Sequence, residues 1–405
     1  MRRTHTTITR YDVHRLTLAR LTDHLRLPDH SRRCPAATVL RVVLAAAARL
    51  CSVTAAARQL ATAPSDQTIR TALAGGLPER WELERRLNRA LAADLPRSLA
   101  GTRQPLAIDL TLRPYHGEPF EELAEIYRSQ AKSGTTHFHA YATAYLVRHG
   151  RRFTLALTWV TKGEPLAGVV QRLLQVARQH GLRPRYLLLD RGFCSVDVIR
   201  FLQAGRHPFL MPLPLRGRKA DHPDGPSGSR VFADARRSGW GEYTLTNAAH
   251  RRATVRVCVK CRNRKGERGR HGRERLVYAF WGIEPASVDW VRHVYRTRFG
   301  IETSYRQMNQ ARVVTTTRNP LVRLFLVGVA LVLRNVWVAL HWEVLSAPRR
   351  GGRVMRLGRL PFKALLLWLL HVVEEQFGMW DVTQTERCPR RGVLACIGEE
   401  RSLIY

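Results

Sequence analysis

The segment Leu106–Leu112 reads L-A-I-D-L-T-L, an apolar β-strand with one aspartate, Asp109, inside it. The segment 186–190, Y-L-L-L-D, is a second buried strand and ends in Asp190. A charge inside a buried strand is unfavourable unless it has a partner. Asp109 could simply accept a hydrogen bond at a strand end, and Asp190 could pair with Arg191. Together, however, the two aspartates predict a site built on two neighbouring strands.

The order of elements around Asp109 predicts an α/β fold with a mixed sheet. The pattern gives strand, strand, strand, helix, strand, helix, strand. After a helical or irregular stretch at 118–132, the predicted elements are strands at 137–147 and 153–160, a helix at 164–180, the strand ending at Asp190, a helix at 193–205 and a strand at 207–213. Three antiparallel strands followed by alternating helices and strands match a ribonuclease-H-like sheet.

A doubly wound nucleotide-binding fold is excluded by the same order, because it would start strand–helix–strand and carry a glycine fingerprint. In the ribonuclease-H-like order the first and fourth strands are neighbours. We therefore expect Asp109 and Asp190 to lie side by side. His137 and His139 share one face of the second strand, where packing on the sheet is favoured over metal binding.

Residues 1–100 predict a helical domain that resembles a helix-turn-helix. Small residues at 52–61 precede a break at Ala63-Pro64-Ser65 and a second short helix. Ser65 or Asp66 would cap that helix. Its residues able to face DNA are Gln67, Thr68, Arg70 and Thr71. An ordinary helical hairpin fits the same pattern.

The rest of the chain predicts a catalytic domain at 101–345 and a C-terminal helical region at 346–405. Residues 216–280 form a β-rich insertion, with strands at 243–246, 253–259 and 276–281 and a basic hairpin tip at 260–275. The apolar stretch 321–340 contains Arg323, Arg334 and Asn335. Because arginine is unfavourable in lipid, a buried core helix is expected here rather than a membrane span.

The charge of the chain predicts a polyanionic partner. Of 405 residues, 67 are Lys or Arg and 32 are Asp or Glu, which gives a formal net charge of +35. Nucleic acid is the first candidate, because phosphate contacts release counterions, and a membrane surface is the second. The seven cysteines are scattered, which fits a reducing cytosol. Cys258 and Cys261 form a single CxxC pair, which alone does not predict a zinc site.

The segment 291–309, V-R-H-V-Y-R-T-R-F-G-I-E-T-S-Y-R-Q-M-N, is predicted as one helix with a polar stripe. With about 3.6 residues per turn, the stripe consists of Tyr295, Arg298, Glu302, Tyr305 and Asn309. A solvated face with an ion pair between Glu302 and Arg298 or Arg306 would explain it without any function.

The alternative is that Glu302 joins Asp109 and Asp190. Three close carboxylates repel one another unless a cation neutralises them. Hard oxygen ligands favour Mg²⁺ or Mn²⁺. Two such ions about 4 Å apart can activate a water or a 3′-hydroxyl and stabilise the leaving oxygen of a phosphodiester.

The order Asp109, Asp190, Glu302 on this topology, with a β-rich insertion before the glutamate, resembles the DDE transposases of bacterial and archaeal insertion sequences. The spacing Y-x2-R-x3-E at Tyr295, Arg298 and Glu302 resembles the signature of their YREK group. The run D-R-G-F at 190–193 resembles the motif of the second aspartate. The resemblance spans about 106–340.

One residue departs from the YREK signature. A lysine is expected seven positions after the glutamate, where this chain has Asn309. Arg306 or Arg312 could take over the phosphate contact of that lysine. The run R-F-G-I-E-T-S-Y-R-Q-M-N-Q-A-R is similar to a subgroup in which asparagine is usual.

The resemblance implies an enzyme that binds terminal inverted repeats, hydrolyses the strand at each end and joins the 3′-ends to target DNA. Its catalytic and metal-binding residues would be Asp109, Asp190 and Glu302, with two Mg²⁺ or Mn²⁺ ions in each active site. The expected DNA contacts are Tyr295, Arg298, Arg306, Asn309, Gln67 and Arg70. Some relatives stack a flipped base on a tryptophan, for which Trp240 and Trp281 are candidates, although a core role is favoured for both.

The partners implied are double-stranded DNA and a second copy of the chain, forming a homodimer on paired ends, without a membrane. The chain carries no apolar signal region at its start, so we expect a cytoplasmic, nucleoid-associated protein. Two other functions fit the same residues. One is a catalytically silent DNA-binding protein, and the other is a ribonuclease-H-like nuclease without strand joining.

Overall fold

The computed structural model describes residues 7–99, 101–147, 152–219, 222–263, 273–350 and 352–380. The helices of the N-terminal region are α1 (Arg10–Leu25), α2 (Ala36–Arg49), α3 (Val53–Gln59), α4 (Asp66–Gly76) and α5 (Arg80–Ala92). The later helices are α6 (Leu166–Gln179), α7 (Val196–Ala204), α8 (Val288–Arg296), α9 (Gly300–Met308), α10 (Pro320–Leu340) and α11 (Phe362–Phe377).

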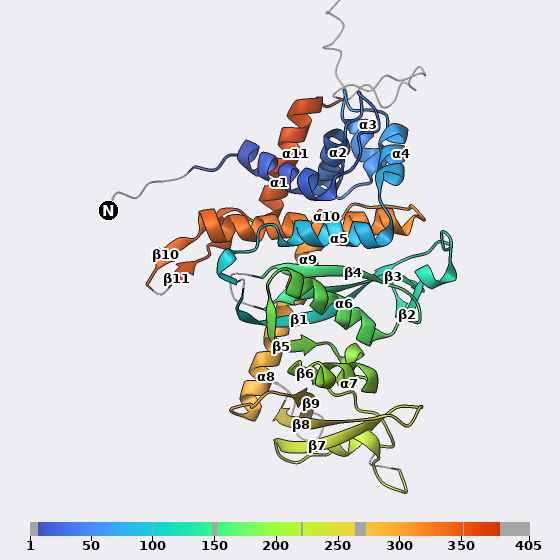
Figure 1. Cartoon of the computed structure of the whole chain (residues 1–405), viewed down its shortest axis with the longest axis vertical. Coiled ribbons are helices and arrows are strands. Elements are labelled where there is room, and N and C mark those ends of the chain that lie inside the picture. The colour runs from blue at the N-terminus through green and yellow to red at the C-terminus, as the bar shows by residue number, and fades with distance from the viewer. Residues whose placement is uncertain are drawn as a thin grey trace, which may run out of the picture.

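The strands of the main sheet are β1 (Arg103–Pro114), β2 (Tyr127–Lys132), β3 (Thr135–Leu146), β4 (Thr154–Val160), β5 (Arg183–Leu189), β6 (Phe209–Pro212), β7 (Gly239–Thr246), β8 (Arg252–Asn263) and β9 (Arg273–Trp281). A two-stranded hairpin of β10 (Ala347–Arg349) and β11 (Gly352–Val354) follows α10. Along the long axis, α1–α4 and α11 lie at one end, α5 and α10 form a layer, the sheet follows, and β7–β9 lie at the other end (Figure 1).

The core of the sheet has the order β4-β3-β1-β5-β6. Strands β3 and β4 run antiparallel to their neighbours, whereas β1, β5 and β6 are parallel. This is the mixed α/β, ribonuclease-H-like arrangement predicted from the order of elements, so the predicted fold class is confirmed. The parallel pairing of β1 with β5 brings the first and fourth predicted strands together, as the order required.

Two parts of the sheet differ from the prediction. The helical or irregular stretch expected at 118–132 ends in a strand, β2, which pairs with the start of β3. Its sequence, Y-R-S-Q-A-K, is polar and mostly exposed, so it lacks the apolar alternation by which strands are recognised. The β-rich insertion also continues the main sheet, because β9 pairs antiparallel with β6. The predicted basic hairpin tip lies partly outside the described residues, since 264–272 are not described.

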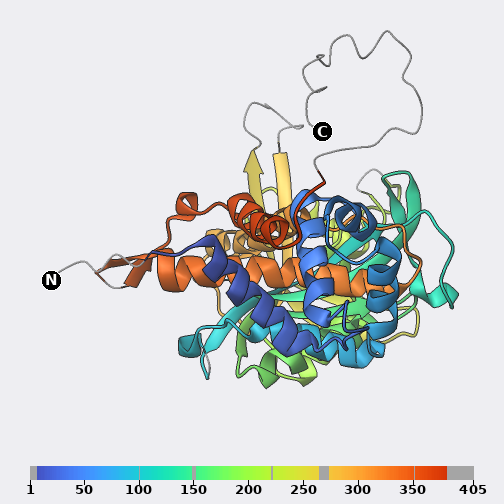
Figure 2. The same cartoon turned by 90° about the horizontal axis from the view of Figure 1, so that it is seen from above.

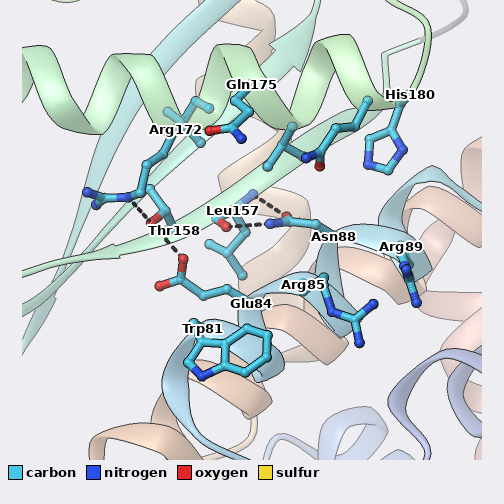
Figure 3. Close-up of a pocket in the computed structure, with 13 residues that line it drawn as sticks. Trp81, Glu84, Arg85, Asn88, Arg89, Leu157, Thr158, Arg172, Gln175 and His180 are labelled. Atoms are coloured by element: carbon cyan, nitrogen blue, oxygen red, sulfur yellow. Dashed lines mark hydrogen bonds between the residues drawn. The ribbon is translucent and has the colours of Figure 1, made fainter.

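Strand β4 is an edge of the core sheet, and asparagine side chains satisfy its outer backbone groups. Asn88 of α5 accepts from the Leu157 N–H at 2.7 Å and donates to the Leu157 carbonyl at 3.0 Å (Figure 3). Asn335 of α10 does the same for Thr154, at 3.0 and 2.7 Å. An open edge invites pairing with another chain. The two amides cover this edge together with Glu84, which accepts from the Trp159 N–H at 3.0 Å, and Arg80, which donates to the Trp159 carbonyl.

Helix α10 is the buried core helix that the arginines in its sequence predicted. By length and composition it could cross a membrane, but 83% of its most apolar stretch is buried inside the molecule. Its buried Arg334 donates to the Tyr145 hydroxyl at 3.2 Å and to Gln307 at 3.2 Å. These bonds satisfy a cation that is otherwise unfavourable in the core.

The N-terminal helices pack together with α11 from the far end of the chain (Figure 2). Arg49 of α2 pairs with Glu374 of α11 at 2.6 Å. The predicted cap is present, because Ser65 accepts from the Thr68 N–H at 3.2 Å at the start of α4. The helix-turn-helix function of α3 and α4 stays a prediction. The domain boundaries at 100 and 345 also stay predictions. Residues 381–405 lie outside the described residues.

The single helix predicted over 291–309 is wrong, because a 3₁₀ turn at Thr297–Phe299 separates α8 from α9. The Thr297 hydroxyl donates to the Val294 carbonyl at 2.6 Å, which competes with the helical bonding of the backbone. Gly300, a poor helix former, follows at once. Arg298 therefore lies in the turn rather than on a regular helical face.

Candidate active site

The two strand aspartates lie at adjacent positions of the sheet. Ile108 of β1 is opposite Leu189 of β5 in the parallel register, so Asp109 and Asp190 follow at the same level. The Asp109 side chain is 13% exposed and that of Asp190 is 44% exposed. One carboxylate therefore forms the floor of the site, and the other lies nearer its opening.

Arg298 joins all three predicted carboxylates. Its guanidinium lies 3.5 Å from Asp109 Oδ2, 3.3 Å from Asp190 Oδ1 and 3.0 Å from Glu302 Oε1. The Arg298 side chain is only 6% exposed, whereas that of Glu302 is 40% exposed. The structure thus brings together the three acidic residues that the sequence predicted, around one buried cation. We call Asp109, Asp190, Glu302 and Arg298 the carboxylate cluster.

Two tyrosines of the predicted stripe hold the cluster in place. The buried Tyr295 hydroxyl donates to the Leu189 carbonyl at 3.3 Å, immediately before Asp190. The Tyr305 hydroxyl lies 2.6 Å from Thr143 Oγ1 and donates to the Asp109 carbonyl at 3.4 Å. Through these bonds α8 and α9 are fastened to β5 and β1, on the strands that carry the aspartates.

The cluster carries more negative than positive charge. Burial raises the pKa of Asp109 from 3.8 to about 6, because the desolvation of its carboxylate outweighs the attraction of Arg298. The neighbouring carboxylates of Asp190 and Glu302 raise the pKa of Asp109 as well. Ionised, the three carboxylates exceed the single guanidinium by two charges. The site therefore favours the approach of a further cation.

The donor set has the chemistry of a magnesium or manganese site, because it consists of carboxylate oxygens. The Nε and Nη1 atoms of Arg298 are buried and have no hydrogen-bond partner among the described residues. Among the residues that the structure describes, no group of three His, Cys, Asp or Glu side chains is spaced to hold a metal ion in the present arrangement. The oxygens that suit the ion are therefore present, but Arg298 occupies the space between them.

The comparison with known families agrees with this site. A family model described as a transposase DDE domain matches residues 100–333, more than half of the 405 residues. The chain belongs to the DDE transposase family. The matched region contains Asp109, Asp190 and Glu302, and transposases of this family generally use divalent metal ions. No curated protein matches the chain. The predicted insertion-sequence transposase is confirmed at the level of the family, and its YREK subgroup stays a prediction.

The other residues predicted to contact DNA in this transposase are not part of the cluster. Arg306 is exposed on α9. Asn309 is exposed, and its Oδ1 accepts from Arg113 Nη1 at 2.7 Å. On α4, Gln67 and Arg70 are both exposed and hydrogen-bond to each other. Their contact with DNA stays a prediction.

A second feature beside the cluster was not predicted. A cavity of about 490 Å³ borders it through Tyr295 and Arg191, the residue after Asp190. Its further arginines are Arg262, Arg275, Arg292 and Arg296. They come from β8, β9 and α8, so only the packing of the insertion against α8 gathers them.

The candidate tryptophans do not line this cavity. Trp240 of β7 is 48% exposed, contrary to the core role favoured for it, and meets Phe280 edge-on at 5.8 Å. Trp281 is half-buried at the end of β9, opposite Phe209. The aromatic residues in the cavity are Tyr278, Tyr295 and Phe299.

One further cavity and one cysteine pair lie apart from the carboxylate cluster. The cavity of about 650 Å³ between α5 and α6 is lined by Trp81, Arg89 and His180 among others (Figure 3), and Asp109, Asp190 and Glu302 are not among its lining residues. Cys258 and Cys261 point to opposite faces of β8, because their spacing is odd. The two thiols therefore cannot hold one metal ion together.

Proposed function

We propose that this transposase cuts DNA at the terminal inverted repeats of its element and joins the 3′-ends to target DNA. The observation that carries the proposal is the meeting of Asp109, Asp190 and Glu302 around Arg298 at the level where β1 and β5 adjoin. Carboxylates gathered without enough counter-charge are costly to a fold. Their retention in one place is explained by a reaction that requires them.

Asp109, Asp190 and Glu302 would hold two Mg²⁺ or Mn²⁺ ions. When bound, such ions lower the pKa of a water or 3′-hydroxyl and stabilise the leaving oxygen of the phosphodiester. Asp109 is fixed by its place inside β1 and by the backbone N–H of Leu110, which donates to its Oδ1 at 2.9 Å. Glu302 is the more exposed ligand and comes from α9, outside the sheet.

Arg298 partly neutralises the carboxylates and carries buried donors that a phosphate would satisfy. Its Nη2 lies near Asp190 and Glu302, and its Nη1 lies 3.5 Å from Asp109 Oδ2. Nε and Nη1 are buried, and neither makes a hydrogen bond within the described residues. A guanidinium with free donors can hold the oxygens of a phosphodiester in a fixed orientation. Tyr295 supports this position, because its ring lies 5.5 Å from the Arg298 guanidinium carbon.

The path of the DNA follows the positive charge. The cavity beside Asp190 brings together five arginines and one carboxylate, Glu274, which pairs with Arg262. Arg306 and Asn309 lie exposed on and after α9, and α4 exposes Gln67 and Arg70 for the inverted repeat. A homodimer would hold two ends at once. The protein would act in the cytoplasm, associated with the nucleoid.

The proposal is tested with duplex DNA carrying the element's own ends, incubated with purified protein and Mg²⁺. We expect cleavage and joined products from the wild type, and neither from Asp109→Asn or Asp190→Asn. Both variants should still bind the ends. Asp197→Asn is the matched control, because Asp197 is an exposed carboxylate on α7 paired with Arg251 at 2.9 Å.

The outcomes separate the alternatives. Cleavage retained in both aspartate variants would refute the assignment of the catalytic residues. Specific binding without any cleavage by the wild type would favour a catalytically silent DNA-binding protein. Hydrolysis products without joined ends would favour a ribonuclease-H-like nuclease.

A further inference from the structure

One face of the sheet leads from the carboxylate cluster to a small cavity. Residues of β1 alternate between the faces, so Asp109, Thr111 and Arg113 lie on the same face. Opposite them on β3, Tyr141 pairs with Thr111 and His139 with Arg113. The row that begins at a catalytic carboxylate therefore continues to basic and aromatic side chains on the same surface.

The cavity at the end of this row has a volume of about 120 Å³. Its polar lining residues are Arg113, His139, Tyr141, Arg312, Thr315 and Arg323. They come from β1, β3, the segment after α9 and the start of α10. None of the lining residues in the described ranges is acidic. We call this the arginine cavity.

His139 gives the sharpest sign that the arginine cavity is made for a ligand. The residue is 1% exposed, and neither of its ring nitrogens has a hydrogen-bond partner among the described residues. One face of the ring is occupied by Tyr115, edge-on at 4.7 Å between ring centres. Buried polar groups are nearly always hydrogen-bonded, and leaving one without a partner costs about 1–3 kcal/mol. A ligand in the cavity would supply the missing partner.

The three arginines give the sign of the ligand's charge. The Nε atom of Arg113 is buried and also lacks a partner among the described residues. Arg323 donates through Nε to the Thr317 carbonyl at 2.7 Å and lies over the Tyr115 ring at 4.6 Å, and it has no carboxylate partner within the described part of the chain. Burial lowers the pKa of both guanidinium groups, and the charge of Arg312 lowers the pKa of Arg113 as well. Such gathered cations are stabilised by an anion.

We propose that the arginine cavity binds one phosphate group of the DNA strand that is held at the carboxylate cluster. The identification of DNA as the source of the phosphate rests on the proposed function, whereas the affinity of the arginine cavity for phosphate does not. A water needs about 10–15 Å³ of cavity space, so the cavity of about 120 Å³ has room for a phosphate group. Arg312 is exposed at the mouth, while Arg113, Arg323 and His139 lie deeper.

The position of the arginine cavity suits a neighbouring phosphate rather than the one that reacts. Arg113 follows Asp109 by four residues on β1, which is about 13 Å at the rise of a β-strand. That separation corresponds to a few nucleotides along a strand. A contact at this point would fix the register of the DNA on the protein without reading its sequence.

Asn309 is a positioning residue for this site. Its Oδ1 accepts from Arg113 Nη1 at 2.7 Å, which holds the guanidinium while Nε remains free. A lysine at 309 has no acceptor and would repel Arg113. The departure from the YREK pattern is thus consistent with a phosphate contact that has moved from residue 309 to the arginines beside it.

The first test uses inorganic phosphate alone. Thermal unfolding of the full chain is measured in phosphate and in chloride at equal ionic strength. We expect phosphate to raise the Tm of the wild type, and this gain to be reduced in Arg312→Gln and Arg113→Gln. Arg15→Gln is the control, because Arg15 is an exposed arginine on α1 already paired with Asp12 at 2.9 Å. Arg312 is exposed, so its variant decides the matter if Arg113→Gln does not fold.

The second test uses duplex DNA carrying the element's ends. The logarithm of affinity is plotted against the logarithm of salt concentration. Losing one phosphate contact should make the slope shallower by about 0.9 and weaken binding at low salt by about tenfold. Arg113→Lys keeps the charge but not the fork of donors, so the slope should stay near that of the wild type while affinity falls.

The two proposals fail in different ways. If Arg312→Gln and Arg113→Gln match Arg15→Gln in both tests while Asp109→Asn abolishes cleavage, the arginine cavity is not a phosphate site and the proposed function stands. If they lose the phosphate effect while Asp109→Asn still cleaves, the cavity stands and the catalytic assignment is wrong. Phosphate that protects the arginine variants as well as the wild type would overturn the inference.

Discussion

Replacing Asp109 by asparagine should stabilise this transposase when no metal is present. The substitution keeps the size of the side chain and removes a buried carboxylate whose charge is only partly balanced by Arg298. Asparagine resembles the protonated acid in shape and charge. The variant therefore measures what the ionised form of Asp109 costs the fold.

The magnitude follows from the pKa of Asp109. Burial raises it from 3.8 to about 6, so the folded state binds the proton of this group more tightly than the unfolded state. A pKa difference of about 2 corresponds to about 3 kcal/mol. Because the folded-state pKa is the higher one, this stability is fully present below pH 4 and is lost as the pH rises through 6. The variant should match the wild type near pH 4 and exceed it by up to about 3 kcal/mol at pH 8.

The assay is thermal unfolding between pH 4 and pH 8 in the presence of a chelator. A difference of about 3 kcal/mol corresponds to roughly 6 °C or more in Tm for a domain of this size. Asp197→Asn should change stability by less than about 1 kcal/mol at every pH, because it removes an exposed ion pair. Added Mg²⁺ should stabilise the wild type by about 2.7 kcal/mol at a hundred times its dissociation constant, and Asp109→Asn less.

The reasoning would be refuted by either of two results. Asp109→Asn could lower the Tm at pH 8, which would mean that the carboxylate is fully paired in the fold. The difference between variant and wild type could also be independent of pH, which would mean that Asp109 is not the group responsible.

Three further predictions concern the surroundings of the site. Arg298→Gln should leave the three carboxylates without a cation and destabilise the fold by about 3–5 kcal/mol at pH 8, with partial recovery in Mg²⁺, measured by thermal unfolding. Asn88→Ala should orphan both backbone groups of Leu157 and cost about 2–3 kcal/mol in urea unfolding, with self-association through β4 seen by sedimentation. Gly328→Ala would place a methyl group 2.3 Å from Leu87 Cδ2 and should cost about 1–3 kcal/mol, because it overpacks the contact with α5. A second change, Leu87→Ala, should recover part of this loss. No recovery would contradict overpacking as the cause.

The aspartates could be placed from the sequence because a strand order determines which strands are neighbours. Once three antiparallel strands and two strand–helix units were recognised, Asp109 and Asp190 had to adjoin. Glu302 could be named from its spacing to Tyr295 and Arg298, but its approach to the aspartates depends on how α9 packs on the sheet. Spacing alone does not contain that information.

The pair of Arg298 with Glu302 was among those predicted, but the contacts of Arg298 with Asp109 and Asp190 were not, because they depend on the turn at Thr297–Phe299. On a regular helix Arg298 would be one of several exposed partners of Glu302. The arginine cavity was hidden for a similar reason. Arg113 and His139 are cross-strand partners in a register that the pattern does not determine, and Arg323 comes from a helix nearly two hundred positions later.

The two ends of the row on β1 carry opposite charge, and under the proposed function a DNA strand would meet both. The carboxylate cluster repels phosphate as long as its excess of negative charge is not neutralised, whereas the charged residues that line the arginine cavity in the described part of the chain are all arginines. In the absence of metal, a strand would therefore be held mainly at Arg113, Arg312 and Arg323. Binding of a divalent ion at Asp109 would remove the repulsion about 13 Å away on the same face. The geometry thus links the placement of the DNA to the loading of the metal, because the two sites share one strand of the sheet.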